Sequence, residues 1–163
     1  TIDTTVQTPL TQCPGTFVDP QVPMGIVPIV RAGLVLLDEV QKVMPLASVY
    51  HLGLVRNESS LEPTCYLNKL PERFDEETRI VILEPMLATG GSIMMAMKEI
   101  TSRGVKPNLI RIISIVAAPP ALRQLSENYP GLEIYTAIID EGLNSKGYIV
   151  PGLGDAGDRA FGT

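Results

Sequence analysis

Short runs rich in Val and Ile, separated by stretches with helical spacing, constrain the fold of this 163-residue chain more than any other feature. Continuous apolar runs of this length suit strands that are buried on both faces, as in a parallel sheet. Such runs occupy residues 24–30, 48–55, 79–84, 109–117 and 133–139. Their alternation with helices predicts βαβ units in a doubly wound, mainly parallel α/β sheet flanked by helices, with ligands at the carboxyl ends of the strands.

Three segments between these runs have the spacing or the boundaries of helices. One has apolar residues at i, i+3, i+4 and i+7 from Ile93, and Gly104 stands where a glycine would end it. A second is predicted over residues 33–43. A third should begin near Pro120, since proline suits the first helical turn, and should end before Pro130.

The length and the 45% hydrophobic content are those of one domain with a buried core, expected over residues 24–163. Residues 1–23 are rich in Thr, Pro and Gln and predict an irregular or edge-strand lead-in. It begins at Thr1 rather than at a methionine, which suggests truncation. Residues 56–78 form a long polar stretch, typical of a lid loop or hairpin, and residues 141–163 form an irregular, glycine-rich tail.

Composition excludes several classes of protein. With 13 basic and 18 acidic residues the formal charge is −5, so a nucleic acid is not an expected partner. No apolar run approaches the roughly 20 residues that span a membrane, and no secretory signal is visible. Cys13 and Cys65 are expected to be free thiols of a reducing compartment, with a single disulfide as the alternative. A cytoplasmic location follows from these expectations.

The stretch between the strand at 79–84 and the next helix has the chemistry of a phosphate site. Its residues 89–92 read Thr-Gly-Gly-Ser, and free N–H groups in a first helical turn attract anions. Thr89 and Ser92 can add hydroxyl donors, whereas the carboxylate of Glu84 suits a cation or sugar hydroxyls. Ordinary helix capping is the competing interpretation. Neither a Walker A loop nor a GxGxxG sequence is present.

This stretch resembles the motif with which uracil phosphoribosyltransferases bind 5-phosphoribosyl 1-diphosphate (PRPP). Eight of nine positions match, and the exception is Glu84, where the family ordinarily has Asp. The resemblance implies a phosphoribosyltransferase-like fold and PRPP contacts from the residues Glu84, Pro85, Met86, Leu87, Ala88, Thr89, Gly90, Gly91 and Ser92.

Two arginines follow predicted strands at the same edge of the sheet. Arg31 comes after the run at 24–30 and Arg56 after the run at 48–55. Their planar guanidinium groups suit bidentate phosphate recognition, although a pair of solvated arginines is the simpler interpretation from spacing alone. Both stand in motifs that resemble the PRPP-contacting arginine motifs of the same family, which implies that they are catalytic residues.

The tail from residue 147 to residue 163 resembles the uracil-binding stretch of the same family. Carried over by position, Ile149, Gly154, Asp155 and Ala156 would contact the base. Asp155 would also face PRPP and act as a catalytic residue. A polar turn is the alternative for residues 155–158. A glycine-rich backbone can bind the edge of a flat, neutral base through its amides.

The resemblance as a whole implies an enzyme of pyrimidine salvage that converts uracil and PRPP into UMP and pyrophosphate. It implies a Mg²⁺-assisted displacement at ribose C1, with the ion held mainly through PRPP and no protein metal site. It also implies a homodimer or larger homo-oligomer and GTP as an activator. A regulatory paralogue that binds PRPP or UMP without turnover is the alternative that Glu84 keeps open.

Overall fold

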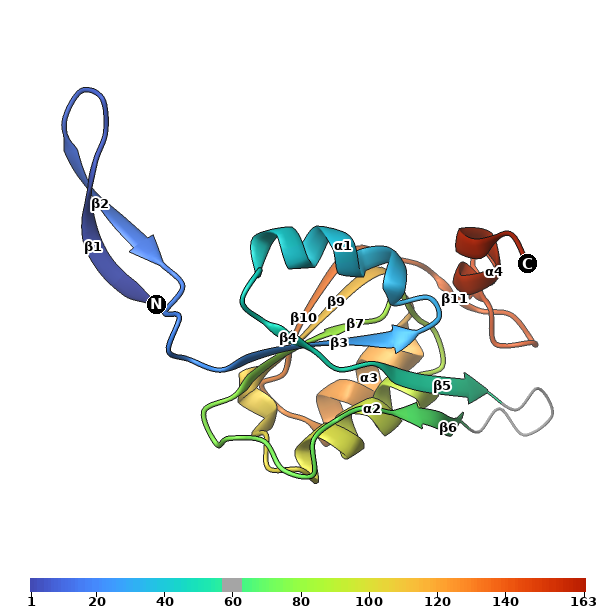
Figure 1. Cartoon of the computed structure of the whole chain (residues 1–163). Helices are drawn as coiled ribbons and strands as arrows, with labels where there is room; N and C mark the ends of the chain where they lie inside the picture. The colour runs from blue at the N-terminus through green and yellow to red at the C-terminus, as the bar shows by residue number, and fades with distance from the viewer. Residues whose placement is uncertain (57–62) are drawn as a thin grey trace.

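The computed structural model of the chain describes residues 1–56 and 63–163, and its largest element is a mixed sheet (Figure 1). The strand order is β10-β9-β7-β3-β5-β6, with β4 beside β3 and β8 beside β9. All described pairs in it are parallel except β5 with β6. The prediction of a mainly parallel α/β sheet is therefore confirmed. The strands are β3 (Met24–Val30), β4 (Ser48–Val49), β5 (Leu52–Arg56), β6 (Pro63–Asn68), β7 (Arg79–Leu83), β8 (Met86–Leu87), β9 (Ile110–Ala117) and β10 (Glu133–Ile139).

Helices cover both faces of the sheet (Figure 1). α1 packs Leu36, Leu37 and Val40 against one face, while α2 and α3 pack against the other. The four α-helices of the described residues are α1 (Leu34–Val43), α2 (Gly91–Thr101), α3 (Pro119–Asn128) and α4 (Ala156–Phe161), and a 3₁₀ turn occupies Pro107–Leu109. None of them is both long and apolar enough to cross a membrane.

The helix predicted from the spacing at Ile93 is α2, and the spacing explains its packing. Ile93, Ala96, Met97 and Ile100 are all buried, in one cluster with strand residues such as Ile82. This face fastens α2 to the sheet, so the first turn of the helix is held at the carboxyl edge.

The first segment of the chain, expected over residues 1–23 to be an irregular or edge-strand lead-in, contains two strands. β1 (Ile2–Gln7) and β2 (Gln12–Phe17) form an antiparallel hairpin that projects from the sheet (Figure 1). Its turn is closed by Thr8, whose Oγ1 accepts a hydrogen bond from the N–H of Thr11. Threonine and valine favour strands, and this preference outweighs the proline and glutamine content.

The run at 133–139 was expected to be buried on both faces, and this was wrong. It forms β10 at the edge of the sheet, where Tyr135, Ile138 and Ile139 are 57%, 53% and 58% exposed. An apolar run shows that a strand can be buried but not whether a neighbour covers it. The run at 48–55 is also divided, because β4 pairs with the start of β3 and β5 with its end.

Part of the stretch predicted as a lid loop or hairpin, residues 56–78, is a hairpin strand. β6 runs antiparallel to β5, while residues 57–62 lie outside the described part of the chain.

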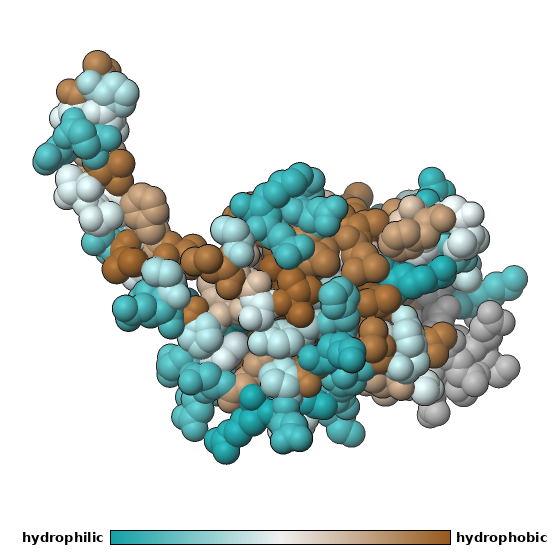
Figure 2. Space-filling view, viewed as in Figure 1, coloured by the Kyte–Doolittle hydropathy of each residue, from teal (hydrophilic) through white to brown (hydrophobic). Residues whose placement is uncertain are grey.

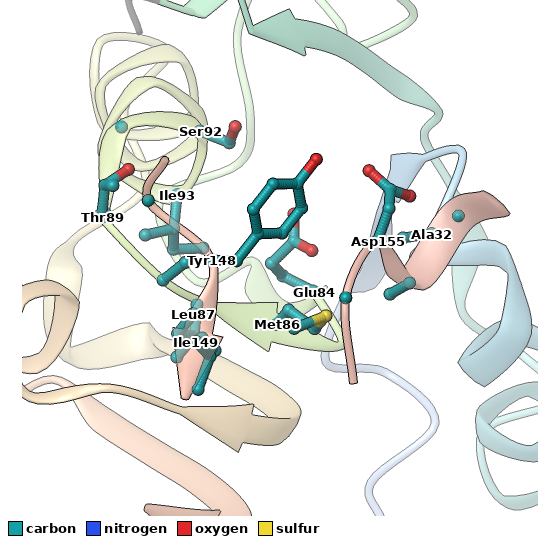
Figure 3. A pocket seen from close by; sticks show the side chains of 17 residues that line it. Ala32, Glu84, Met86, Leu87, Thr89, Ser92, Ile93, Tyr148, Ile149 and Asp155 are labelled. Atoms are coloured by element: carbon teal, nitrogen blue, oxygen red, sulfur yellow. The ribbon is translucent and has the colours of Figure 1, made fainter. Parts of the chain in front are cut away.

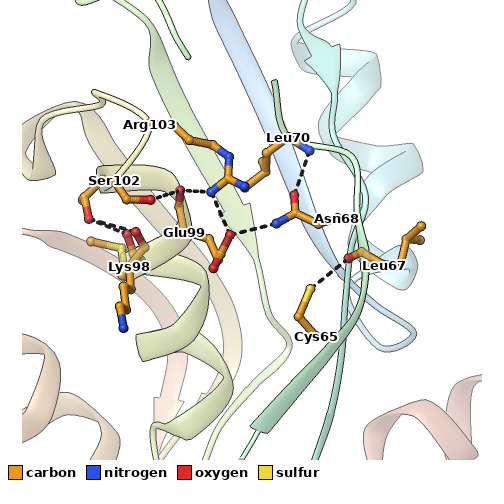
Figure 4. A network of polar contacts seen from close by, with 10 residues as sticks. Cys65, Leu67, Asn68, Leu70, Lys98, Glu99, Ser102 and Arg103 are labelled. Atoms are coloured by element: carbon orange, nitrogen blue, oxygen red, sulfur yellow. Dashed lines mark hydrogen bonds and ion pairs between the residues drawn. The ribbon is translucent and has the colours of Figure 1, made fainter. Parts of the chain in front are cut away.

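A polar network anchors the end of β6 to α2 (Figure 4). Nδ2 of Asn68 donates to Oε2 of Glu99 at 2.8 Å, and the same oxygen accepts from Nη1 of Arg103 at 2.7 Å. Cys13 and Cys65 are both free, as predicted.

We expect Met97→Ala to lower the free energy of unfolding by about 2–5 kcal/mol, because the truncation leaves a cavity in the core. Met97 is fully buried, and Lys98 beside it is exposed. Urea denaturation of both alanine variants measures the effect. Lys98→Ala should stay within about 0.5 kcal/mol of the wild type. Equal losses in the two variants would contradict the packing described for α2.

Candidate active site

Two adjoining cavities open at the carboxyl edge of the sheet, with volumes of about 200 Å³ and 1000 Å³. The smaller one lies between the stretch at residues 84–93 and the tail (Figure 3). The larger one lies beside it and is reached by Arg31. Residues shared by both cavities include Glu84, Ser92, Tyr148 and Asp155. The two cavities can therefore be occupied by one extended ligand.

The turn that carries Arg31 depends on a close backbone approach at Gly33. Gly33 donates its N–H to the carbonyl of Ile29 at 2.8 Å, between the end of β3 and the start of α1. A Cβ added to Gly33 would lie 2.4 Å from the carbonyl oxygen of Leu83 and 2.6 Å from the nitrogen of Ile29. Only glycine fits there, so the turn after β3 lies directly against the end of β7.

The start of α2 has the features of an anion site. Gly90 is the N-cap residue with φ of 98°, and no side chain caps the helix. The capping alternative for Thr89 and Ser92 is thus wrong, and neither hydroxyl has a hydrogen-bond partner in the described part of the chain. The first-turn N–H groups have no acceptor within the helix. Together these donors can bind a phosphate group.

Glu84 occupies the end of β7 and is almost fully buried, with 8% of its surface exposed. Burial raises the pKa of its carboxyl group to about 8; the backbone N–H of Met86 opposes this shift, and the charge of Asp155 adds to it. The site therefore holds Glu84 neutral at pH 7 in the absence of a ligand.

The glycine-rich tail is more ordered than the irregular segment expected over residues 141–163. β11 (Gly142–Leu143) and β12 (Ile149–Val150) pair antiparallel, and α4 follows. Ile149 is buried against Val116 and Ala118 at the end of β9, which fixes the tail beside the sheet edge. Residues 155–158 are not a simple polar turn, because they begin α4.

The structure brings most of the predicted site residues together. Ile149, Gly154, Asp155 and Ala156 line the smaller cavity with eight of the nine motif residues. Pro85 is the exception: it is buried, and its carbonyl accepts a hydrogen bond from Oγ of Ser114 at 3.0 Å.

The two predicted arginines differ in what the structure describes. Arg31 lines the larger cavity together with Asp155 and Glu84. Arg56 ends β5 opposite Pro63, and its side chain lies outside the described part of the chain.

Several lining residues were not predicted. The ring of Tyr148 stands in the middle of the hollow, between Ser92 and Asp155 (Figure 3). Lys146 and Asp158 line the larger cavity. Tyr148 directly precedes Ile149, so the position of Ile149 in the tail was an available signal. Asp158 had no such signal, because its contacts depend on the folded chain.

The arrangement suits a ligand with a phosphate at one end, ribose-like hydroxyls in the middle and a second anionic group near Arg31. Three or more His, Cys, Asp or Glu side chains that could together hold a metal ion do not occur among residues 1–56 and 63–163. The carboxylates of Glu84 and Asp155 nevertheless face the same hollow and can serve as oxygen ligands of a cation that a phosphate ligand brings with it.

Known proteins share both the sequence and the fold. The uracil phosphoribosyltransferase family pattern matches residues 1–163. Uracil phosphoribosyltransferases of Nostoc and Synechocystis are 67% and 60% identical over the whole chain, which spans 76% of each relative. The solved AQ2163 protein of Aquifex aeolicus superimposes with a TM-score of 0.84 at 38% identity, over 98% of this chain and 74% of that one.

A purine phosphoribosyltransferase of Pyrococcus horikoshii shares the fold with a TM-score of 0.57, covering 74% of this chain and 72% of that one at 17% identity. The shared fold alone would not distinguish this family from other proteins of the same architecture. The family match over residues 1–163 and the sequence identities above 50% do so. The chain belongs to the uracil phosphoribosyltransferase family.

Proposed function

We propose that the chain transfers the phosphoribosyl group of PRPP to uracil, forming UMP and pyrophosphate. The bond between ribose C1 and the diphosphate oxygen breaks, and a bond from C1 to uracil N1 forms. The N1 proton leaves with the departing pyrophosphate. The observation that carries the proposal is that the stretch at 84–92 and the tail residues 149–156 line one hollow.

The 5-phosphate of PRPP fits the start of α2. The N–H groups of the first turn and the hydroxyls of Thr89 and Ser92 are donors without acceptors among residues 1–56 and 63–163, and the positive end of the helix dipole favours an anion. The ribose hydroxyls can then donate to the carboxylates of Glu84 and Asp155. Charge and hydrogen bonding thus orient the sugar with C1 toward the tail.

The diphosphate would extend into the larger cavity toward Arg31 and Arg56. Donors fixed before the reaction stabilise the negative charge that gathers on the leaving group without reorganisation. Mg²⁺ would be held mainly by the PRPP oxygens, with help from one carboxylate of the site, and would neutralise part of that charge. The chain's own residues then supply position and a fixed electrostatic field rather than a covalent nucleophile.

Uracil would lie along the tail at Ile149, Gly154, Asp155 and Ala156. Buried Ile149 offers an apolar contact for one part of the ring. Glycine at 154 and the small side chain of Ala156 let backbone amides approach the polar edge of the base. The base and the sugar would thereby meet beside Asp155, which lines both cavities.

The assembly is proposed to be a homodimer or larger homo-oligomer. The projecting hairpin β1–β2 supports this, since an isolated two-stranded hairpin is at best marginally stable in water. Leu10, Phe17 and Val18, in or beside the hairpin, are 96%, 51% and 59% exposed. Figure 2 shows apolar residues, in brown, among polar ones on the projecting hairpin. Activation by GTP and a cytoplasmic location stay predictions from the resemblance and the composition.

We expect Asp155→Ala and Arg56→Ala each to lower kcat/KM for UMP formation by about 100-fold, because Asp155 lines both cavities and Arg56 stands in a motif that resembles a PRPP-contacting motif of the family. Arg123→Ala, on the exposed face of α3, is the control and should match the wild type. The assay measures UMP from uracil, PRPP and Mg²⁺. Undiminished turnover in both site variants would refute the assignment, and PRPP binding without any UMP would indicate a regulatory protein.

We expect the KM for PRPP to fall as the pH rises from about 6.5 toward 9. The pKa of Glu84 is raised to about 8 in the empty site, so most of the protein carries a neutral Glu84 at pH 7. Ribose hydroxyls form stronger hydrogen bonds to an ionised carboxylate than to a protonated one, so PRPP binding favours loss of the Glu84 proton. The free-energy cost of removing this proton falls as the pH rises.

Glu84→Gln cannot titrate and serves as the matched control. The ratio of the wild-type KM to the Glu84→Gln KM should fall through this pH range and level off above the pKa of Glu84. A ratio that stays constant would show that Glu84 is not the group whose proton PRPP displaces.

A further inference from the structure

Arg31 is held by the last helix of the chain. Its Nη2 lies 2.7 Å from Oδ1 of Asp158, and its Nη1 donates to Oγ1 of Thr163 at 3.1 Å. The arginine and Asp158 are 127 positions apart in the sequence. Both side chains are about half exposed, 49% and 48%, and both line the larger cavity.

Asp158 also contacts the second charged residue of the proposed site. Its backbone N–H donates to Oδ1 of Asp155 at 2.9 Å, which makes Asp155 the N-cap of α4. One residue therefore touches Arg31 through its side chain and Asp155 through its backbone. The orientation of both groups toward the cavity depends on α4.

Gly157 makes room for this arrangement. It is buried, and a Cβ added to it would lie 3.2 Å from Oδ1 of Asp155 and 3.6 Å from Nη2 of Arg31. The guanidinium group thus packs near the backbone at the start of α4, where a side chain at residue 157 would crowd it. Its freedom to rotate is limited by the backbone at Gly157 and by the ion pair with Asp158.

We propose that Asp158 is a positioning residue that fixes Arg31 for recognition of the diphosphate of PRPP. This inference rests on the proposed function of the site. A guanidinium group has more N–H donors than the two contacts with Asp158 and Thr163 use, so others remain for the ligand. The ion pair also offsets the negative charge of Asp158, which would otherwise face the same cavity as the diphosphate.

The side chain and the backbone of Asp158 can be tested separately. Substitution removes the side-chain contacts of Asp158 with Arg31 and with Oγ1 of Thr163, which lies 3.4 Å from Oδ1, but leaves the backbone N–H that donates to Asp155. A change in Asp158 variants therefore reports on Arg31 rather than on the capping of α4. Asp158→Asn keeps an oxygen that accepts from Nη2 and loses only the charge, so it is the conservative comparison.

We expect Asp158→Ala to raise the KM for PRPP by about tenfold, because a mobile Arg31 must be ordered by the ligand. The KM for uracil and the thermal midpoint should stay unchanged. Asp158→Asn should restore most of the loss. Adding Asp158→Ala to Arg31→Ala should cause no further rise, since the partner is already absent. Asp38→Asn, on the exposed side of α1, is the control.

A KM for PRPP that is unchanged or lower in Asp158→Ala, or independent penalties in the double variant, would overturn the inference. A lower KM would show that Asp158 competes with the diphosphate for Arg31. If the wild type forms no UMP, the proposed function fails instead. Calorimetric titration with Mg²⁺ and pyrophosphate then decides the role of Asp158, because weaker binding by Asp158→Ala than by wild type supports it and equal or absent binding contradicts it.

Discussion

The close contact between Gly33 and the carbonyl of Leu83 is the constraint on which the site depends. It holds the turn after β3 against the end of β7, so close that a Cβ added to Gly33 would lie 2.4 Å from the carbonyl oxygen of Leu83. Arg31 stands two residues before this contact and Glu84 one residue after it. The basic and acidic groups of the hollow are thus neighbours because two parallel strands end side by side, with a glycine between them.

Electrostatics in the hollow follow from burial. Glu84 is neutral at pH 7 in the empty site because its desolvation outweighs the hydrogen bond from Met86. Arg31 is paired with Asp158, while the hydroxyls of Thr89 and Ser92 have no hydrogen-bond partner in the part of the chain that the structure describes. A neutral Glu84, an Arg31–Asp158 ion pair and uncharged hydroxyl donors leave little negative charge to repel a ligand that carries several negative charges.

The sequence predicted what depends on local periodicity and on motifs. The spacing from Ile93 located α2, and the stretches at 84–92 and 149–156, which the resemblance assigns to PRPP and to uracil, line one cavity. The sequence could not show that β10 is an edge strand, because an apolar run looks the same whether or not another strand or helix packs against it. It also missed Asp158, whose partner Arg31 is distant in the chain and adjacent only after folding.

A crystal structure of the complex with UMP and pyrophosphate would show whether one hollow holds both substrates. We expect the UMP phosphate at the N–H groups of residues 91 and 92, the base along residues 149–156, and pyrophosphate against Arg31 in the larger cavity. A nucleotide bound with its phosphate away from the start of α2, or with its base outside the tail, would contradict the claim that one hollow holds both substrates.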